Sequence, residues 1–194
     1  MLTIPELIRL FSTRESLPVQ VDDVIDEFRK HGIKDEIYIW QVEADTDLLR
    51  GKIKHWDWEH DGNKTCVADI DISKNMDVRW QRIVSCKELL HMLDPPEAQV
   101  KSEDEIDHLV EKIILPAGLQ DPVSDGYHVN TDRVAELQAS AVLFPFAARN
   151  LFLKPFQEKK LPLAEIIRLT DLPPRYVAYV MSDIWPGIHE LLAK

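Results

Sequence analysis

The chain has little cysteine, little glycine and no long hydrophobic run, and each shortage excludes a class of protein. Its two cysteines, Cys66 and Cys86, are too few for the disulfide framework of a small secreted domain. Its six glycines are scattered, so there is no glycine-rich loop to bind phosphate groups and no G-x-S-x-G nucleophile motif. No stretch reaches the roughly 18 consecutive apolar residues of a membrane-spanning helix.

Positive charge is scarce as well. The 194 residues include 23 Lys and Arg against 34 Asp and Glu, which gives a formal net charge of -11. Such a surface repels phosphate backbones, which argues against direct binding of nucleic acid. The charge is uneven: residues 1–60 carry 8 basic against 13 acidic residues, residues 61–148 carry 8 against 16, and residues 149–194 carry 7 against 5. The C-terminal tail therefore differs electrostatically from the body of the chain.

The remaining composition is typical of a folded protein. An apolar fraction of 45% and five tryptophans predict a packed core in a single domain over residues 1–194, with a helical tail over 149–194. The N-terminus lacks a basic region followed by a long apolar run, so we expect no signal peptide and a cytoplasmic location.

The spacing of apolar residues predicts an α+β fold. Helical spacing covers residues 2–12 and 20–31, with Gly32 as the expected end of the second helix. Strand-like runs follow at Glu36–Glu43, Leu49–Trp58 and Thr65–Ile72. Turn-forming residues separate the three runs, so we expect a small antiparallel sheet in which each strand pairs with the next.

The second half of the chain is predicted to be helical. The expected segments are a helix from about Met76 to Leu93, a helix from Ser102 to Pro116, a loop over 117–130, a helix from Asn130 or Thr131 to Phe144, and tail helices at Leu163–Thr170, at Pro174–Ser182 and after Pro186. The tail has the order of a helix-turn-helix. Its second helix carries one basic residue, Arg175, which favours packing or protein contact over base reading.

The most informative segment is Arg82-Ile-Val-Ser-Cys-Lys-Glu-Leu-Leu-His91. In the zinc-peptidase motif H-E-x-x-H, two histidines one helical turn apart bind one metal and the glutamate acts as general base. Here Glu88 and His91 occupy the second and last positions, whereas Lys87 occupies the first. A lysine amine binds a metal only when neutral, and a reference pKa near 10.4 makes deprotonation at pH 7 cost about 4–5 kcal/mol.

Lys87 is therefore expected to supply the positive charge that a metal would otherwise bring. Its ammonium group would neutralise Glu88 and a second acidic residue. The alternative is an ordinary solvated helix face, because Lys-Glu-x-x-His is a common string on amphipathic helices.

Two features flank the motif. A strand-like Ala68-Asp-Ile-Asp-Ile72 and the approach Trp80-Gln-Arg82 precede it, and a helix with Glu136 that ends at Leu143-Phe-Pro145 follows it. With these features the chain resembles the ImmA/IrrE family of zincin-like metallopeptidases over roughly residues 36–182. The resemblance implies a zincin-like fold, in which a small antiparallel sheet packs on the motif helix and a helical C-terminal tail follows.

The resemblance also implies roles for single residues. Arg82 matches the approach residue, Glu88 the general base, His91 the second zinc histidine and Glu136 the third zinc ligand. Lys87 departs from the first zinc histidine, which leaves two protein ligands where a catalytic zinc site supplies three. Glu136 also has a plainer interpretation as a surface residue of its helix.

Trp56 and Trp58 form an aromatic pair in the second predicted strand. Strand alternation places both on the same side of the sheet. They either line a groove for an extended partner chain or cover the sheet as packing residues.

Two functional hypotheses follow. In the first, the chain is a cytoplasmic ImmA/IrrE-like regulator of a prophage or stress response that acts on or binds a partner protein such as a transcriptional repressor. If its centre is active, His91 and Glu136 hold zinc and Glu88 activates a bound water. In the second, the chain is a non-catalytic protein-binding module without a metal, in which Lys87 pairs with Glu88 or Glu136. The lysine favours a degenerate centre and no cofactor.

Overall fold

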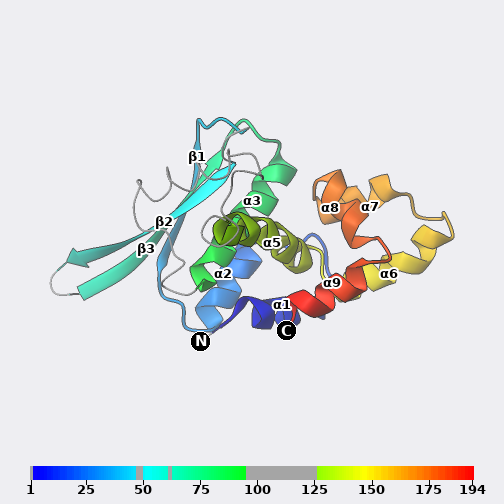
Figure 1. Ribbon diagram of the computed structural model, residues 1–194, viewed down its shortest axis with the longest axis horizontal. Helices are drawn as coiled ribbons and strands as arrows, with labels where there is room; N and C mark the ends of the chain where they lie inside the picture. The colour runs from blue at the N-terminus through cyan, green and yellow to red at the C-terminus, as the bar shows by residue number, and fades with distance from the viewer. Residues whose placement is uncertain (1, 47–49, 61–62, 95–125) are drawn as a thin grey trace.

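The computed structural model describes residues 2–46, 50–60, 63–94 and 126–194 (Figure 1). The predicted helix from Ser102 to Pro116 and the predicted loop up to residue 125 lie outside these residues. Within them the fold is α+β, with eight α-helices, a three-stranded sheet and a helical C-terminal region. No helix of the described part is long and apolar enough to cross a membrane.

Two helices open the chain as predicted. Helix α1 (Ile4–Ser12) starts at a capping box, in which Thr3 and Glu6 exchange hydrogen bonds between their side chains and backbone N–H groups. Helix α2 (Val21–Lys30) is followed by Gly32, whose φ of 84° is a left-handed conformation that glycine adopts without strain. The apolar face of α1, with Leu7 and Phe11, is fully buried in the core.

The sheet is mixed, which corrects the predicted antiparallel arrangement. Its strands are β1 (Glu36–Val42), β2 (Gly51–His60) and β3 (Asn63–Ser73), in the spatial order β1-β3-β2. Strand β2 pairs antiparallel with β3 as predicted, but β1 pairs parallel with β3 and not with β2.

Composition explains this order. A central strand usually carries more apolar residues than an edge strand, because another strand flanks it on each side and leaves it less exposed to water. Strand β3 supplies four buried apolar residues: Val67, Ala68, Ile70 and Ile72. Strand β2 supplies Ile53 alone, so it occupies an edge. Ile70 pairs with Ile39 of β1 on one side and with Ile53 of β2 on the other.

Helix α3 (Val78–Leu90) forms the centre of the fold. The Asp77 side chain caps its N-terminus by accepting a hydrogen bond from the backbone N–H of Trp80, and a short 3₁₀ turn, η1 (His91–Leu93), ends it. Every residue from 82 to 90 is buried, because β2 and β3 cover one side while α2 and α5 cover others. The predicted motif helix is confirmed, but it is enclosed rather than amphipathic.

Helix α5 (Gly126–Leu143) packs against α3 and carries Glu136. It starts before Asn130 and Thr131, so the predicted cap and the predicted loop over 126–130 are both wrong. Residues that often cap helices are also tolerated inside them, and here the helix continues through them.

Four helices make the tail: α6 (Phe146–Gln157), α7 (Leu163–Thr170), α8 (Pro174–Val180) and α9 (Trp185–Leu192). The last three match the predicted segments, whereas α6 was not predicted because it follows Pro145 and contains Pro155. In Figure 1 the tail lies on the side of α5 away from the sheet. The N-terminal and C-terminal helices are in contact, because Arg9 of α1 donates a hydrogen bond to the carbonyl of Ala193, the residue after α9.

Candidate functional site

Lys87 and Glu88 form a buried ion pair in the last turn of α3. The Lys87 Nζ lies 2.9 Å from Glu88 Oε1, and the two side chains are only 8% and 4% exposed. The expected pairing of the lysine with Glu88 is therefore present. An ordinary solvated helix face would leave both charges in water, so this plainer interpretation is wrong.

Glycine at position 51 lets β2 lie directly on this pair. A Cβ atom at Gly51 would stand 3.0 Å from Glu88 Oε1 and 2.5 Å from Val84 Cγ1. Only a residue without a side chain permits this approach. The start of β2 consequently covers the Glu88 carboxylate, whereas a general base must reach the water that it activates.

His91 lies just beyond the ion pair, where α3 passes into η1. Its Nδ1 is 2.6 Å from Asp94 Oδ2. Burial of the ring lowers the pKa of His91, but the hydrogen bond to Asp94 and the nearby charge of Glu88 outweigh burial, and the net pKa is raised above 6.5. The surroundings of His91 thus favour its protonated form more than those of a free histidine do.

Glu136 of α5 contacts two arginines and a tyrosine hydroxyl. Its Oε2 accepts hydrogen bonds from the Tyr176 hydroxyl at 2.6 Å and from Arg175 Nη2 at 3.2 Å, and its Oε1 lies 3.8 Å from Arg50 Nη1. Burial raises the pKa of Tyr176, and its hydrogen bond to Glu136 raises it further. The Glu136 side chain is 26% exposed and is held between Arg50, just before β2, and the start of α8.

Trp80 completes this cluster. The guanidinium groups of Arg50 and Arg175 lie 4.5 Å and 4.3 Å from its ring centroid, and the Tyr176 ring meets it edge-on at 5.6 Å. Cation–π contacts of this kind hold the two arginines in place. Arg50 and Tyr176 had no sequence signal, because the members of the cluster are far apart in the chain.

The donor set does not fit a zinc ion. Lys87 brings an ammonium group where the first ligand would be, and both oxygens of Glu136 are engaged by Arg and Tyr donors. His91 is the one predicted ligand with a suitable arrangement, since metal-binding histidines commonly use the second ring nitrogen to contact a carboxylate. Among the residues that the structure describes, no cluster of three or more His, Cys, Asp or Glu side chains is arranged to hold a metal.

Arg82 anchors α3 to two distant segments. Its guanidinium donates hydrogen bonds to the carbonyls of Thr170 at 2.8 Å, Asp171 at 2.6 Å and Val19, and it lies 3.5 Å from the Asp171 carboxylate. The predicted approach residue therefore ties α3 to the end of α7 and the turn after it, and to the segment before α2.

Trp56 and Trp58 lie across the sheet from the ion pair. Ile53 of the same strand points into the core, and alternation directs Trp56 and Trp58 to the opposite, exposed face. The Trp56 indole donates a 2.6 Å hydrogen bond to Asp69 of β3. Their aromatic rings remain about half exposed, so they cover the sheet only in part.

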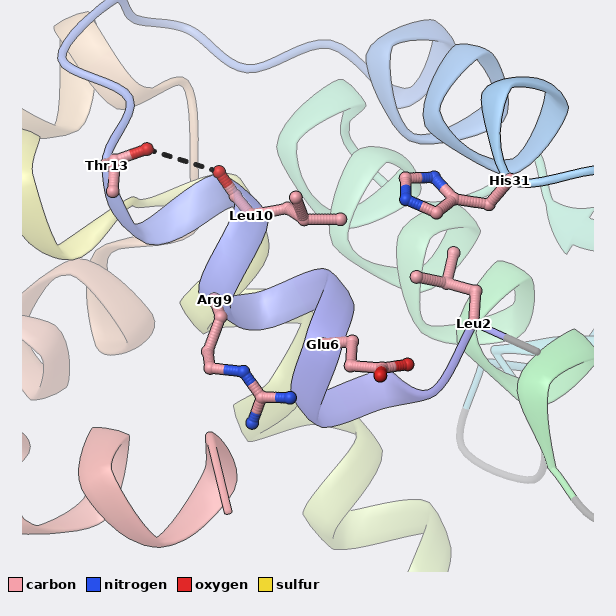
Figure 2. Close-up of a pocket in the computed structure, with 6 residues that line it drawn as sticks. All are labelled: Leu2, Glu6, Arg9, Leu10, Thr13 and His31. Atoms are coloured by element: carbon pink, nitrogen blue, oxygen red, sulfur yellow. Dashed lines mark hydrogen bonds between the residues drawn. The ribbon is translucent and has the colours of Figure 1, made fainter.

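A pocket of about 600 Å³ opens elsewhere, between α1 and the end of α2 (Figure 2). It is lined by Leu2, Glu6, Arg9, Leu10, Thr13 and His31. Its charged groups already serve the fold: Glu6 caps α1 and Arg9 binds the Ala193 carbonyl. None of the predicted site residues lines it.

The two cysteines differ in accessibility, which gives a direct test of the packing around α3. Cys86 is fully buried and burial raises its pKa to about 12, whereas Cys66 is exposed. Since the thiolate is the reactive form, we expect a disulfide reagent at pH 8 to label Cys66 alone in the folded protein. Cys86 should react only after unfolding in denaturant. Rapid labelling of folded Cys66→Ser protein would contradict the enclosed position of α3.

Comparison with known protein families, characterised proteins and solved structures finds no match. The resemblance to the ImmA/IrrE family therefore rests on the motif residues and their order along the chain. What the site offers chemically is a buried ion pair, a histidine paired with an aspartate, and a glutamate held by two arginines and a tyrosine.

Proposed function

We propose that this chain is a cytoplasmic regulatory protein of the ImmA/IrrE type that binds a partner protein, such as a transcriptional repressor, without cleaving it. In this proposal the peptidase centre is degenerate, and Lys87 takes the place of the metal. The observation that carries it is the ion pair between Lys87 and Glu88, which is buried at the position of the zinc motif.

Electrostatics supports this assignment. A buried carboxylate is strongly unfavourable unless a nearby positive charge or hydrogen bonds compensate it. In a zinc peptidase the metal would supply positive charge, and here the lysine ammonium supplies it at 2.9 Å. The close approach of Gly51 to Glu88 supports a role for this carboxylate in stabilising the fold.

A second candidate is an active metallopeptidase. The contact between His91 and Asp94 favours it, because the same carboxylate–histidine arrangement orients zinc ligands in metal enzymes. This candidate requires Glu136 to leave Arg175 and Tyr176 and bind the metal. It also requires Glu88→Gln to abolish cleavage of the partner.

Metal content separates the two candidates. We expect protein purified without chelator to contain far less than one zinc per chain, measured by plasma mass spectrometry. Lys87→His restores the missing ligand type, and we expect this variant to bind more zinc than wild type. Roughly one zinc per wild-type chain, lost in Glu136→Ala, would contradict the proposal and favour the peptidase.

A further inference from the structure

We propose that the outer face of the sheet binds a basic segment of a partner protein through arginine or lysine side chains. This face carries four large exposed aromatic residues: Tyr38, Trp40, Trp56 and Trp58. Exposed apolar patches of this kind are uncommon on proteins without a binding partner. The inference rests on the proposed function only for the idea that the partner is a protein, because no residue of the buried ion pair takes part.

Strand register brings the aromatic residues together. Tyr38 of β1 lies opposite Asp69 of β3, and Trp56 of β2 lies opposite Val67, two residues earlier on the same strand. The rings of Tyr38 and Trp40 stack at 5.9 Å with an interplanar angle of 18°. Val67 lies on the same outer face, directly opposite Trp56, and is buried.

Asp69 holds two of these rings in place. Its Oδ1 accepts a hydrogen bond from Trp40 Nε1 at 3.2 Å, and its Oδ2 accepts one from Trp56 Nε1 at 2.6 Å. Both indoles are thus fixed by one carboxylate, with 53% of Trp40 and 42% of Trp56 left exposed. A negative charge at the N–H edge of an indole makes its face more attractive to a cation, since the ring face already carries negative charge density.

The charges around the rings also suit a basic partner. This face carries the carboxylates of Glu36, Asp69 and Asp71 against the ammonium groups of Lys52 and Lys54. Asp71 lies 3.6 Å from Lys52, whereas Glu36 accepts a hydrogen bond from the neutral Tyr38 hydroxyl at 2.6 Å. The whole chain has a net charge of -11, which attracts basic partners over longer distances.

An arginine side chain matches both features of the face. A guanidinium can stack on an aromatic ring and donate to a carboxylate at the same time. Among the described residues, no Lys or Arg lies over the rings of Tyr38, Trp40 or Trp56, so these rings are available to a partner. A purely apolar partner would instead bury the charges of Glu36 and Asp69, whose hydrogen bonds come from the neutral donors of Tyr38, Trp40 and Trp56.

The test uses a fluorescent peptide of alternating arginine and glycine, with a glutamate–glycine peptide as the charge-reversed probe. The key variant is Trp40→Leu/Trp56→Leu, which leaves the net charge unchanged. We expect wild type to bind the arginine peptide but not the glutamate peptide at physiological salt. The double variant should bind about tenfold more weakly, because two cation–π contacts are lost. Ile184→Ala removes an exposed apolar side chain of the tail and should leave binding unchanged.

Equal binding of the arginine peptide by wild type and the double variant would overturn the inference, because it would mean that the net charge alone attracts the peptide. So would absence of binding to wild type, or preferential binding of a neutral oligosaccharide. Asp69→Asn keeps every ring and removes one charge, so weaker binding by this variant provides a second test that does not depend on the double variant folding. The metal content of the protein does not enter this experiment, so its failure is distinguishable from failure of the proposed function.

Discussion

Replacing Lys87 by methionine is expected to lower the free energy of unfolding by about 3–5 kcal/mol. Methionine preserves the apolar length of the side chain but removes the charge beside Glu88. The Glu88 carboxylate, 4% exposed and covered by Gly51, then stays buried without its counterion. Urea denaturation followed by circular dichroism measures this change. The buried pair makes this one of the two largest effects that the structure predicts.

Two further variants isolate the cause of that loss. Lys87→Met/Glu88→Leu removes both charges, and we expect it to recover much of the stability, since apolar pairs replace buried ion pairs well. Lys74→Met is the matched control, because Lys74 and Glu43 form an exposed ion pair at 2.7 Å. It should change stability by less than about 1 kcal/mol. A Lys87→Met variant as stable as this control would mean that the ion pair is not buried.

Much of the fold could be predicted from local patterns. The two N-terminal helices and the three strands follow from apolar spacing, capping residues and turns, each of which acts over a few neighbouring residues. The strand order could not be predicted in this way, because it depends on which strand buries most apolar surface. Val67, Ala68, Ile70 and Ile72 give β3 the most buried apolar residues of the three strands, and it lies in the centre with β1 parallel to it.

In the candidate site, too, contacts between residues near in the sequence could be predicted, whereas contacts between distant residues could not. Lys87, Glu88 and His91 lie within one and a half helical turns, so their proximity follows from helix geometry. The partners of Glu136 are Arg50, which precedes β2, and two residues at the start of α8, while Trp80 of α3 contacts both arginines; no local spacing relates residues 50, 80, 136 and 175. The burial of Glu88 could not be predicted from the sequence either. It depends on a glycine 37 positions earlier that allows a strand to lie on the helix.

Replacing Arg82 by leucine is expected to lower the free energy of unfolding by about 3–5 kcal/mol, as estimated from the loss of several buried hydrogen bonds. The guanidinium donates to the carbonyls of Val19, Thr170 and Asp171, which belong to two segments far apart in the sequence. Leucine fills part of the space but leaves these carbonyls without their donor. Lysine should not rescue the loss, because a single ammonium group cannot reproduce the planar fork of arginine.

A neighbouring arginine provides the control for this prediction. Arg79 contacts the same Asp171 carboxylate at 3.3 Å, but it is far more exposed than Arg82, and among the described residues its hydrogen bond goes to that side chain rather than to a buried carbonyl. Arg79→Leu should therefore change the free energy of unfolding by less than about 1 kcal/mol in the same urea titration. If the two leucine variants were equally stable, the effect of Arg82 would be a surface charge effect. A large difference between them would instead assign the stability to the buried carbonyl contacts, which join α3 to the tail.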